Sequence, residues 1–218
     1  MGKTLIFPKH PLITITHSVM RGGKSTNAMI NYFNASQRPD SNPLILKPSI
    51  DNRDGKFVDK FGIMTSRVFQ GVEYPAYYAT RIDDYFIKNI LLTKDGRRKY
   101  NKIIVDEAQF FSGDDIETLA GAVVEEMKLS VDCYGLKSDI NANLFPGTAK
   151  LLVLAGQNTY ELPHDCEVSN CGRKATTHVR FRDGKPDPDR SSVAIEKGNI
   201  TYLSVCALCW LELMKGCK

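Results

Sequence analysis

The residues best placed to do chemistry form a Gly-Lys-Ser turn, Gly23-Lys24-Ser25, after an apolar strand-like run at 12–16 and before a helix-compatible run. A strand, a glycine-bearing turn and a helix are the context of a phosphate-binding loop, where backbone N–H groups and the helix N-terminus face the phosphates. In that context Lys24 reaches the β- and γ-phosphates, and the Ser25 hydroxyl ligates magnesium. Ser18 stands where the usual pattern has its first glycine. An ordinary basic turn before a helix is therefore the alternative.

A pair of acids forms the second candidate group. The apolar run Ile103-Ile104-Val105 predicts a buried strand, and Asp106 and Glu107 follow it directly. In open α/β sheets, ligands bind outside the carboxyl ends of the strands. At such a position Asp106 would hold magnesium, directly or through water, and Glu107 would accept a proton or align a nucleophile. Together with the upstream turn, the two acids favour a magnesium–nucleotide site over a strand that simply ends in solvated acids.

Four cysteines form two closely spaced pairs, Cys166 with Cys171 and Cys206 with Cys209. Both spacings lie in the range of structural zinc sites. Because four thiolates fill a tetrahedral shell, we expect the Zn²⁺ to stabilise a small domain rather than to catalyse. A disulfide framework is a poor alternative in a reducing compartment, and chance spacing is the other alternative.

Size and charge narrow the class of protein. The chain has 218 residues, enough for one domain with a substantial core, or for one domain and a small appendage. Its net charge of +4 suits anionic ligands but is too weak to indicate a nucleic-acid surface. No apolar run approaches the ~20 residues of a membrane span, and the N-terminus lacks a signal peptide pattern. We therefore expect no membrane partner, no nucleic-acid partner and a cytoplasmic protein.

The first ~160 residues alternate apolar strand-like runs with helical patterns, which predicts βαβ units, hence an α/β fold with a mostly parallel sheet. Residues 49–72 show no clear periodicity and are expected to form a functional or mobile loop, where Arg53, Lys56, Lys60 and Arg67 could meet phosphates. The patterns predict helices at 82–92 and 114–127, and strands at 44–46, 129–134, 151–154 and 177–181.

Taken in order, these segments resemble the type II thymidine kinase family, from about residue 12 to residue 210. Three segments carry the specific resemblance: 106–111 matches the family's D-E-x-Q-F, 134–147 is similar to G-L-x-x-D-F…F-x-G, and 198–209 is similar to G-x-x-x-Y-x-x-V-C-x-x-C. The resemblance implies a P-loop (RecA-like) α/β domain with flanking helices over residues 1–160. It implies a zinc-ribbon-like domain over residues 161–218, with a lasso loop that covers the nucleoside.

The resemblance also implies an activity, the transfer of the γ-phosphate of ATP to the 5′-hydroxyl of thymidine to give dTMP. The family is commonly tetrameric, so a homotetramer and dTTP feedback inhibition are expected. Glu107 resembles the catalytic base, Lys24 and Arg67 would neutralise phosphate charge, and Ser25 and Asp106 would hold Mg²⁺. The implied ATP-binding residues are Ser18, Val19, Met20, Arg21, Gly22, Gly23, Lys24, Ser25, Thr26, Asp106 and Gln109. The implied nucleoside-binding residues are Met20, Phe110, Leu136, Ile140, Gly198 and Tyr202.

Departures from the family pattern keep two other functions open. Ile140 occupies a position where the family usually has phenylalanine, and Arg21 stands where an aromatic residue is frequent. With Ser18, these departures leave room for a catalytically weakened nucleotide-binding relative. The other alternative is a P-loop ATPase with a zinc ribbon that binds nucleic acid. The weak net charge and the absence of a basic-aromatic stripe in the tail count against it.

Overall fold

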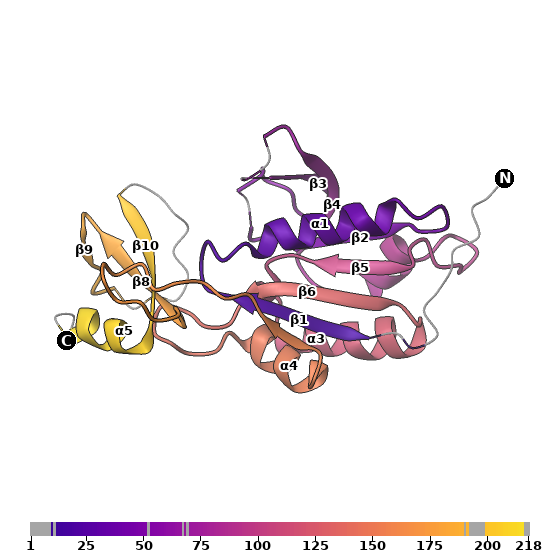
Figure 1. Ribbon diagram of the computed structural model, residues 1–218. Helices are drawn as coiled ribbons and strands as arrows, with labels where there is room; N and C mark the ends of the chain where they lie inside the picture. The colour runs from indigo at the N-terminus through magenta and orange to yellow at the C-terminus, as the bar shows by residue number, and fades with distance from the viewer. Residues whose placement is uncertain are drawn as a thin grey trace.

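The computed structural model describes residues 10, 12–51, 53–66, 68, 70–189, 191 and 199–215. Within these ranges the chain forms a seven-stranded sheet and a three-stranded sheet, which lie side by side in a larger and a smaller unit (Figure 1). No helix in the described part of the chain is both long and apolar enough to cross a membrane.

The larger sheet has the strand order β3-β4-β2-β5-β6-β1-β7. All of its strand pairs are parallel except β3 with β4. The mostly parallel α/β sheet predicted from the sequence is thus confirmed. Its strands are β1 (Ile13–Ser18), β2 (Pro43–Pro48), β3 (Lys60–Thr65), β4 (Glu73–Ala79), β5 (Lys102–Val105), β6 (Ser130–Leu136) and β7 (Thr159–Glu161).

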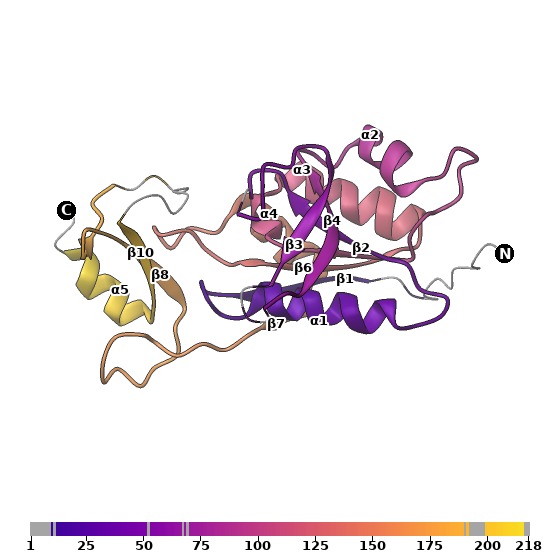
Figure 2. The ribbon, with the colours of Figure 1, turned by 90° about the horizontal axis from the view of Figure 1, so that it is seen from above.

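Helices cover both faces of this sheet. Helix α1 (Lys24–Ser36) lies on one face, and α3 (Gly113–Thr118) and α4 (Pro146–Ala155) lie on the other (Figures 1 and 2). Because side chains alternate along a strand, Ile103 and Val105 join the core cluster beneath α3 and α4, whereas Ile104 packs with Ala28 of α1. Both faces of β5 are therefore buried, as its continuous apolar run predicts.

The remaining helical segments are short. The predicted helix at 82–92 is α2 (Asp84–Phe86) followed by η1 (Ile87–Leu91), a π-helical turn. The predicted helix at 114–127 is α3 followed by a π-helical segment, η3 (Leu119–Glu126). Ser112 begins α3 with a capping box, in which its hydroxyl accepts from Asp115 N and the Asp115 carboxylate accepts in return.

Two sequence expectations are wrong. The run 151–154 is part of α4 rather than a strand, with Leu151 buried and Val153 78% exposed. Pro146 is the first residue of that helix, a position where the backbone N–H that proline lacks has no partner within the helix. An apolar run of only four residues is too short for the spacing of its apolar residues to distinguish a strand from a helix. The segment 49–72 is also not all loop, because it contains β3, whose mostly exposed residues at the sheet edge hide any alternation.

The smaller sheet has the order β10-β8-β9, all antiparallel. Its elements are β8 (Thr177–Arg182), which confirms the strand predicted at 177–181, β9 (Lys185–Pro186), β10 (Ile200–Val205) and the helix α5 (Ala207–Met214). Arg180 of β8 is fully buried. Its guanidinium pairs with Asp187 at 2.8 Å and donates to the Ser191 carbonyl at 3.0 Å. This buried ionic cluster, the Arg180 cluster, therefore ties β8 to the chain that follows β9.

Candidate active site

A cavity of about 600 Å³ opens at the carboxyl ends of β1, β2, β5 and β6 and is lined by both units. Twelve of the residues predicted from the sequence line it. They are Met20, Arg21, Gly22, Gly23, Lys24, Ser25, Thr26, Glu107, Phe110, Leu136, Ile140 and Tyr202. Four others, Ser18, Val19, Asp106 and Gln109, are buried behind the cavity wall. Arg67 and Gly198 lie outside the described residues.

The Gly-Lys-Ser turn leads from β1 into α1, as the sequence predicts. Gly23 adopts a left-handed conformation (φ 78°), which glycine accepts without steric cost, and α1 begins at the next residue. The Lys24 ammonium is buried and donates to the Val19 carbonyl at 2.7 Å. Burial lowers the pKa of Lys24, against the opposing charges of Glu107 and Asp106. The turn thus presents an inward-directed cation beside the N-terminus of a helix.

Ser18, the departure from the usual loop pattern, has a structural partner. Its hydroxyl donates to the Leu162 carbonyl at 2.8 Å and so fastens the loop to the segment after β7. A Cβ atom at Gly22 would lie 1.9 Å from Ser18 Oγ, so the space that the serine side chain occupies requires glycine at position 22. With serine at position 18, only glycine fits at position 22 without a shift of the serine side chain.

Asp106 and Ser25 lie together at the end of β5. The Ser25 hydroxyl donates to Asp106 Oδ1 at 3.0 Å, and Lys47 Nζ lies 3.3 Å from Asp106 Oδ2. Burial raises the pKa of Asp106 even though Lys47 opposes the shift. A hydroxyl and a carboxylate within hydrogen-bond distance are two oxygen ligands of the kind that Mg²⁺ takes beside a nucleotide. These residues fit a magnesium site.

Glu107 is held on several sides. Its backbone is left-handed (φ 55°), a strained conformation for a side chain of this size and one that is common at functional sites. Gln109 Nε2 donates to Glu107 Oε2 at 2.6 Å, and the Arg53 guanidinium pairs with Oε1. Burial alone would raise the pKa of Glu107, but the charges of Arg53 and Lys24 outweigh it and lower the pKa. The side chain is therefore a carboxylate at neutral pH.

Gln109 acts on Glu107 rather than on the cavity itself. Its amide oxygen accepts from Leu136 N at 3.0 Å, which fixes the amide group between β6 and Glu107. A Cβ atom at Gly135 would come within 2.8 Å of Gln109 Oε1, so a glycine at that place leaves room for the glutamine. The structure thus places Gln109 as a support of the carboxylate.

Sequence reasoning missed the importance of Lys47, Asp51 and Asp54. The Lys47 ammonium lies 2.9 Å from Asp51 and 3.1 Å from Asp54, in addition to its contact with Asp106. Burial would lower the pKa of Lys47, but these three carboxylates outweigh it and raise the pKa. A signal was present, because a lysine directly after the buried run Leu44–Leu46 is expensive to bury without acidic partners.

Arg53 was noted in the sequence only as a charge that could meet phosphates. In the structure it bridges two acids, since Nη2 donates to Asp51 Oδ2 at 2.7 Å and also pairs with Glu107. Its side chain lines the cavity together with Lys24. Of the arginines predicted to lie near phosphate, Arg53 is the one that the described structure brings to the carboxylates.

Four aromatic side chains line another part of the cavity, which we call its aromatic end. The rings of Phe110 and Phe145 meet edge to face with centroids 5.9 Å apart, and those of His178 and Tyr202 do so at 6.0 Å. Burial, with a smaller contribution from the charge of Lys24, lowers the pKa of His178 to about 4, so the imidazole is neutral at pH 7. Ile140 completes this wall, and its carbonyl accepts from Trp210 Nε1 at 3.1 Å.

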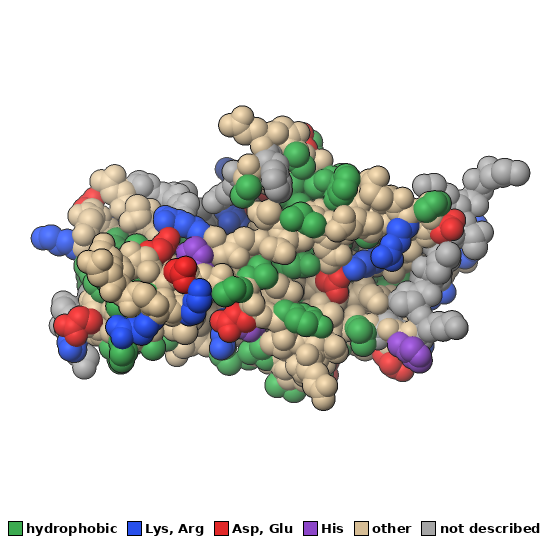
Figure 3. Space-filling model, in the orientation of Figure 1, with side chains coloured by type: hydrophobic (Ala, Val, Ile, Leu, Met, Phe, Trp, Pro, Cys, Tyr) green, Lys and Arg blue, Asp and Glu red, His purple; other side chains and the backbone are tan. Residues whose placement is uncertain are grey.

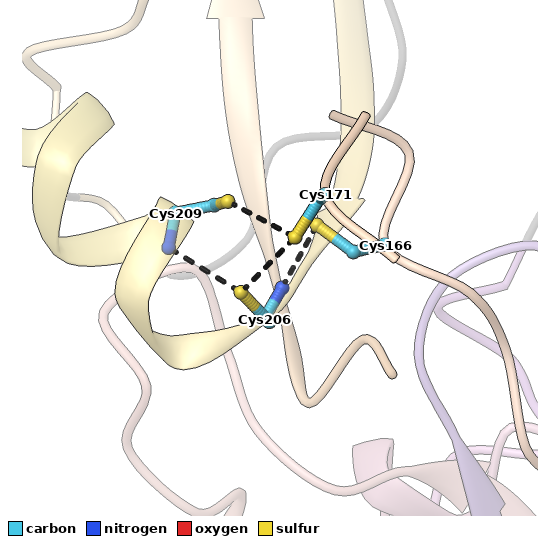
Figure 4. Close-up of side chains that lie close together, drawn as sticks. All are labelled: Cys166, Cys171, Cys206 and Cys209. Atoms are coloured by element: carbon cyan, nitrogen blue, oxygen red, sulfur yellow. Dashed lines mark hydrogen bonds between the residues drawn. The ribbon is translucent and has the colours of Figure 1, made fainter. Parts of the chain in front are cut away.

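The four cysteines predicted to bind zinc converge in the small unit, with their sulfur atoms directed toward one another (Figure 4). All four Sγ atoms lie within 4.8 Å of one another. Cys171 Sγ is 3.7 Å from Cys206 Sγ and 3.6 Å from Cys209 Sγ. A tetrahedral zinc with Zn–S bonds of about 2.3 Å separates its sulfurs by about 3.8 Å. The tetrad therefore fits zinc.

The fold and cavity have the features of a P-loop protein, because a Gly-Lys-Ser turn joins a strand of a mostly parallel sheet to a helix and a carboxylate pair lies nearby. A family model described as thymidine kinase matches residues 12–210. The chain belongs to the thymidine kinase family. It is 36% identical to a thymidine kinase of Pasteurella multocida over 90% of this chain and 94% of that protein, and 36% identical to one of Haemophilus influenzae with the same coverage. It is 31% identical to a thymidine kinase of enterobacteria phage T4 over 93% of this chain and 97% of the relative.

Proposed function

We propose that this protein is an ATP-dependent thymidine kinase, which transfers the γ-phosphate of ATP to the 5′-hydroxyl of thymidine and forms dTMP and ADP. The family membership supports the reaction. The observation that carries the proposal is the position of Glu107. Arg53 and Gln109 hold it as a carboxylate in the wall of the cavity that the phosphate loop and the aromatic side chains also line.

At the phosphate end, the chain supplies positive charge where a transferred phosphoryl group spreads its negative charge. Lys24 and Arg53 both line this end, and a loose phosphoryl-transfer transition state depends mainly on such positioning and neutralisation. Ser25 and Asp106 would hold Mg²⁺, which neutralises phosphate charge when bound. Arg67, the cation assigned from the sequence, remains a prediction.

At the acceptor end, Glu107 takes the proton of the 5′-hydroxyl as the new O–P bond forms and the bond to the ADP leaving group breaks. A carboxylate of low pKa is unprotonated across the neutral range and so is ready to accept that proton. Met20, Phe110 and Tyr202, which line the cavity, would enclose the base in apolar surface. An apolar enclosure keeps water from competing with the nucleoside for the phosphoryl group.

We propose that residues 161–218 form a zinc-binding domain appended to an α/β domain over 1–160. A structural Zn²⁺ held by Cys166, Cys171, Cys206 and Cys209 would stabilise a unit whose apolar cluster is small. In this arrangement the zinc acts on the reaction only through the folding of β8 and β10, whose His178 and Tyr202 line the cavity.

We further propose a homotetramer, with dTTP as a feedback inhibitor that would occupy the same cavity. Exposed apolar side chains support self-association. They occur on α1 (Ile30 and Phe33), on α4 (Val153 and Leu154) and on β7 (Tyr160). Figure 3 shows apolar side chains spread over the face of the larger unit that is turned toward the viewer. Cytoplasmic residence stays a prediction.

One assay tests the reaction. The protein is incubated with Mg²⁺, ATP and one nucleoside at a time, and nucleoside monophosphate and ADP are measured. We expect dTMP and ADP in equal amounts with thymidine. ADP release that needs no nucleoside and rises with single-stranded DNA would indicate an ATPase instead. No turnover with any nucleoside, in a protein that still binds ATP, would indicate a catalytically weakened relative.

A further inference from the structure

Strand β10 of the small unit contacts the phosphate loop directly. The Ser204 hydroxyl donates to the Met20 carbonyl at 2.8 Å, and only 1% of Ser204 is exposed. Met20 belongs to the loop between β1 and α1, 184 residues earlier in the chain. Because Ser204 is buried and Met20 is partly buried, a loss of the hydroxyl would leave the Met20 carbonyl without that donor.

Glu167 adds a second link between the same two segments. Its Oε2 accepts from Ser204 N at 2.5 Å, and its Oε1 lies 3.6 Å from Arg21 Nη1. Arg21 has a left-handed backbone (φ 60°), which residues other than glycine rarely adopt without support from their surroundings. The Arg21 side chain is 59% exposed, so the ion pair is weak. The hydrogen bond from the buried Ser204 hydroxyl to the Met20 carbonyl is the stronger constraint.

The strand that carries Ser204 also carries Tyr202, a residue of the proposed nucleoside pocket. Side chains two residues apart on a strand share a face, so Ser204 and Tyr202 lie on the same face of β10. Tyr202 lines the aromatic end of the cavity, whereas Ser204 contacts the loop. One face of β10 thus carries both a side chain that lines the cavity and the hydroxyl that bonds to the phosphate loop.

We propose that Ser204 is a positioning residue for the phosphate loop. It holds Met20 and Arg21 so that the backbone N–H groups of the following turn face the phosphates of ATP, and Glu167 orients Ser204 for this role. The small unit therefore contributes to ATP affinity, although no side chain of that unit needs to touch the phosphates. The inference rests on the proposed function only in that residues 17–25 bind ATP, and it does not depend on the acceptor.

The test compares the full-length zinc-loaded protein with Ser204→Ala. Mg–ATP affinity is measured by calorimetry without nucleoside, and steady-state kinetics are measured with thymidine. We expect ATP to bind about three- to tenfold more weakly, as the loss of one net hydrogen bond implies. The KM for ATP rises by the same factor, and kcat stays within about twofold. The KM for thymidine rises less than the KM for ATP, because Ser204 bonds the Met20 backbone rather than its side chain. Zinc content and melting temperature serve as checks of folding.

Ser138→Ala is the matched control. The Ser138 and Thr177 hydroxyls lie 3.4 Å apart and also join the larger unit to β8, but this pair does not include the bond to the Met20 carbonyl that Ser204 makes. Its ATP affinity should equal that of the unmodified protein. Equal weakening in Ser138→Ala and Ser204→Ala would mean that any loosened contact between the units has this effect, and would overturn the proposal. Unchanged ATP affinity in folded Ser204→Ala would also overturn it.

Glu167→Ala keeps the proposal testable where Ser204→Ala fails to fold or to retain zinc. The Glu167 side chain is a quarter exposed, so water fills the space that this variant leaves, and the variant removes the acceptor of Ser204 N. Weaker ATP binding is expected, and unchanged binding would refute the positioning role. If the unmodified protein itself does not bind Mg–ATP, the proposed function fails rather than this inference.

Discussion

Glu107→Gln removes the proposed base while keeping the shape of the side chain. In the structure both carboxylate oxygens face donors, Gln109 Nε2 at Oε2 and the Arg53 guanidinium at Oε1. A glutamine has one amide NH2 group in place of one oxygen. Whichever way the amide turns, one N–H group then faces another donor. We expect this mismatch to cost about 1–3 kcal/mol of folding stability.

The expected loss of activity is larger than that loss of stability. General-base catalysis contributes roughly 10²–10⁴-fold to a rate, which corresponds to about 3–5 kcal/mol in the barrier. ATP affinity should stay nearly constant, because we assign the contacts with the phosphates to Lys24 and the loop backbone rather than to Glu107. The variant should therefore lower kcat with thymidine by roughly 10²–10⁴ and leave the KM for ATP within a few-fold.

The pH dependence supplies a second readout. Arg53 and Lys24 hold the pKa of Glu107 below its ordinary value, so in the unmodified protein activity falls only at acid pH, as the carboxylate becomes protonated. Glutamine does not titrate, and this acid limb should disappear in the variant. Glu117→Gln, an exposed change on α3, is the control for the loss of one negative charge. Full activity in folded Glu107→Gln, with the acid limb intact, would rule out Glu107 as the base.

Three further outcomes are expected. Arg53→Met should lower turnover roughly 10–100-fold and move the acid limb of the pH profile to higher pH, because Glu107 loses the guanidinium that lowers its pKa. A greater loss of turnover in Arg67→Met would mean that Arg67, the arginine assigned from the sequence, is the main cation that neutralises the phosphate. Cys206→Ser should lower the zinc content and the melting temperature together, and a folded, active, zinc-free protein would contradict the structural zinc. Gly22→Ala should destabilise the protein by about 1–3 kcal/mol, because the added Cβ would overlap Ser18 Oγ. A second change, Ser18→Gly, should recover part of this loss, and a double-mutant cycle of thermal stability measures the recovery.

Much of the fold and site could be predicted because the informative residues are neighbours in sequence. The phosphate loop and the acids Asp106 and Glu107 each follow an apolar run, and in a parallel sheet such strand ends meet at one edge. The spacing of the cysteine pairs is likewise local information. In each case a short stretch of sequence contained both the signal for the local structure and the side chains that could bind phosphate or metal.

The carboxylates around Lys47 could not be assembled in the same way. The sheet register pairs Leu46 with Val105, and this pairing sets Lys47 beside Asp106. No local pattern reveals which strands are neighbours or how they align. Arg53 was hard to assign for the same reason, since its partner Glu107 is 54 residues away and belongs to another strand end. The α4 error has a different cause, because four apolar residues fit a strand and a buried helical turn equally well.

The Arg180 cluster has a consequence for how the small unit folds. This unit has a limited apolar core, and a buried guanidinium without partners would cost several kcal/mol. The pairing with Asp187 and the Ser191 carbonyl is possible only after the chain beyond β8 has turned back on itself. A half-formed unit is therefore penalised, and partly folded states should be sparsely populated. The pKa of Asp187 lies below its ordinary value because its hydrogen bonds and the charges of Arg182 and Arg180 outweigh the cost of burial, so acid that protonates Asp187 would leave the buried Arg180 guanidinium without this counter-charge.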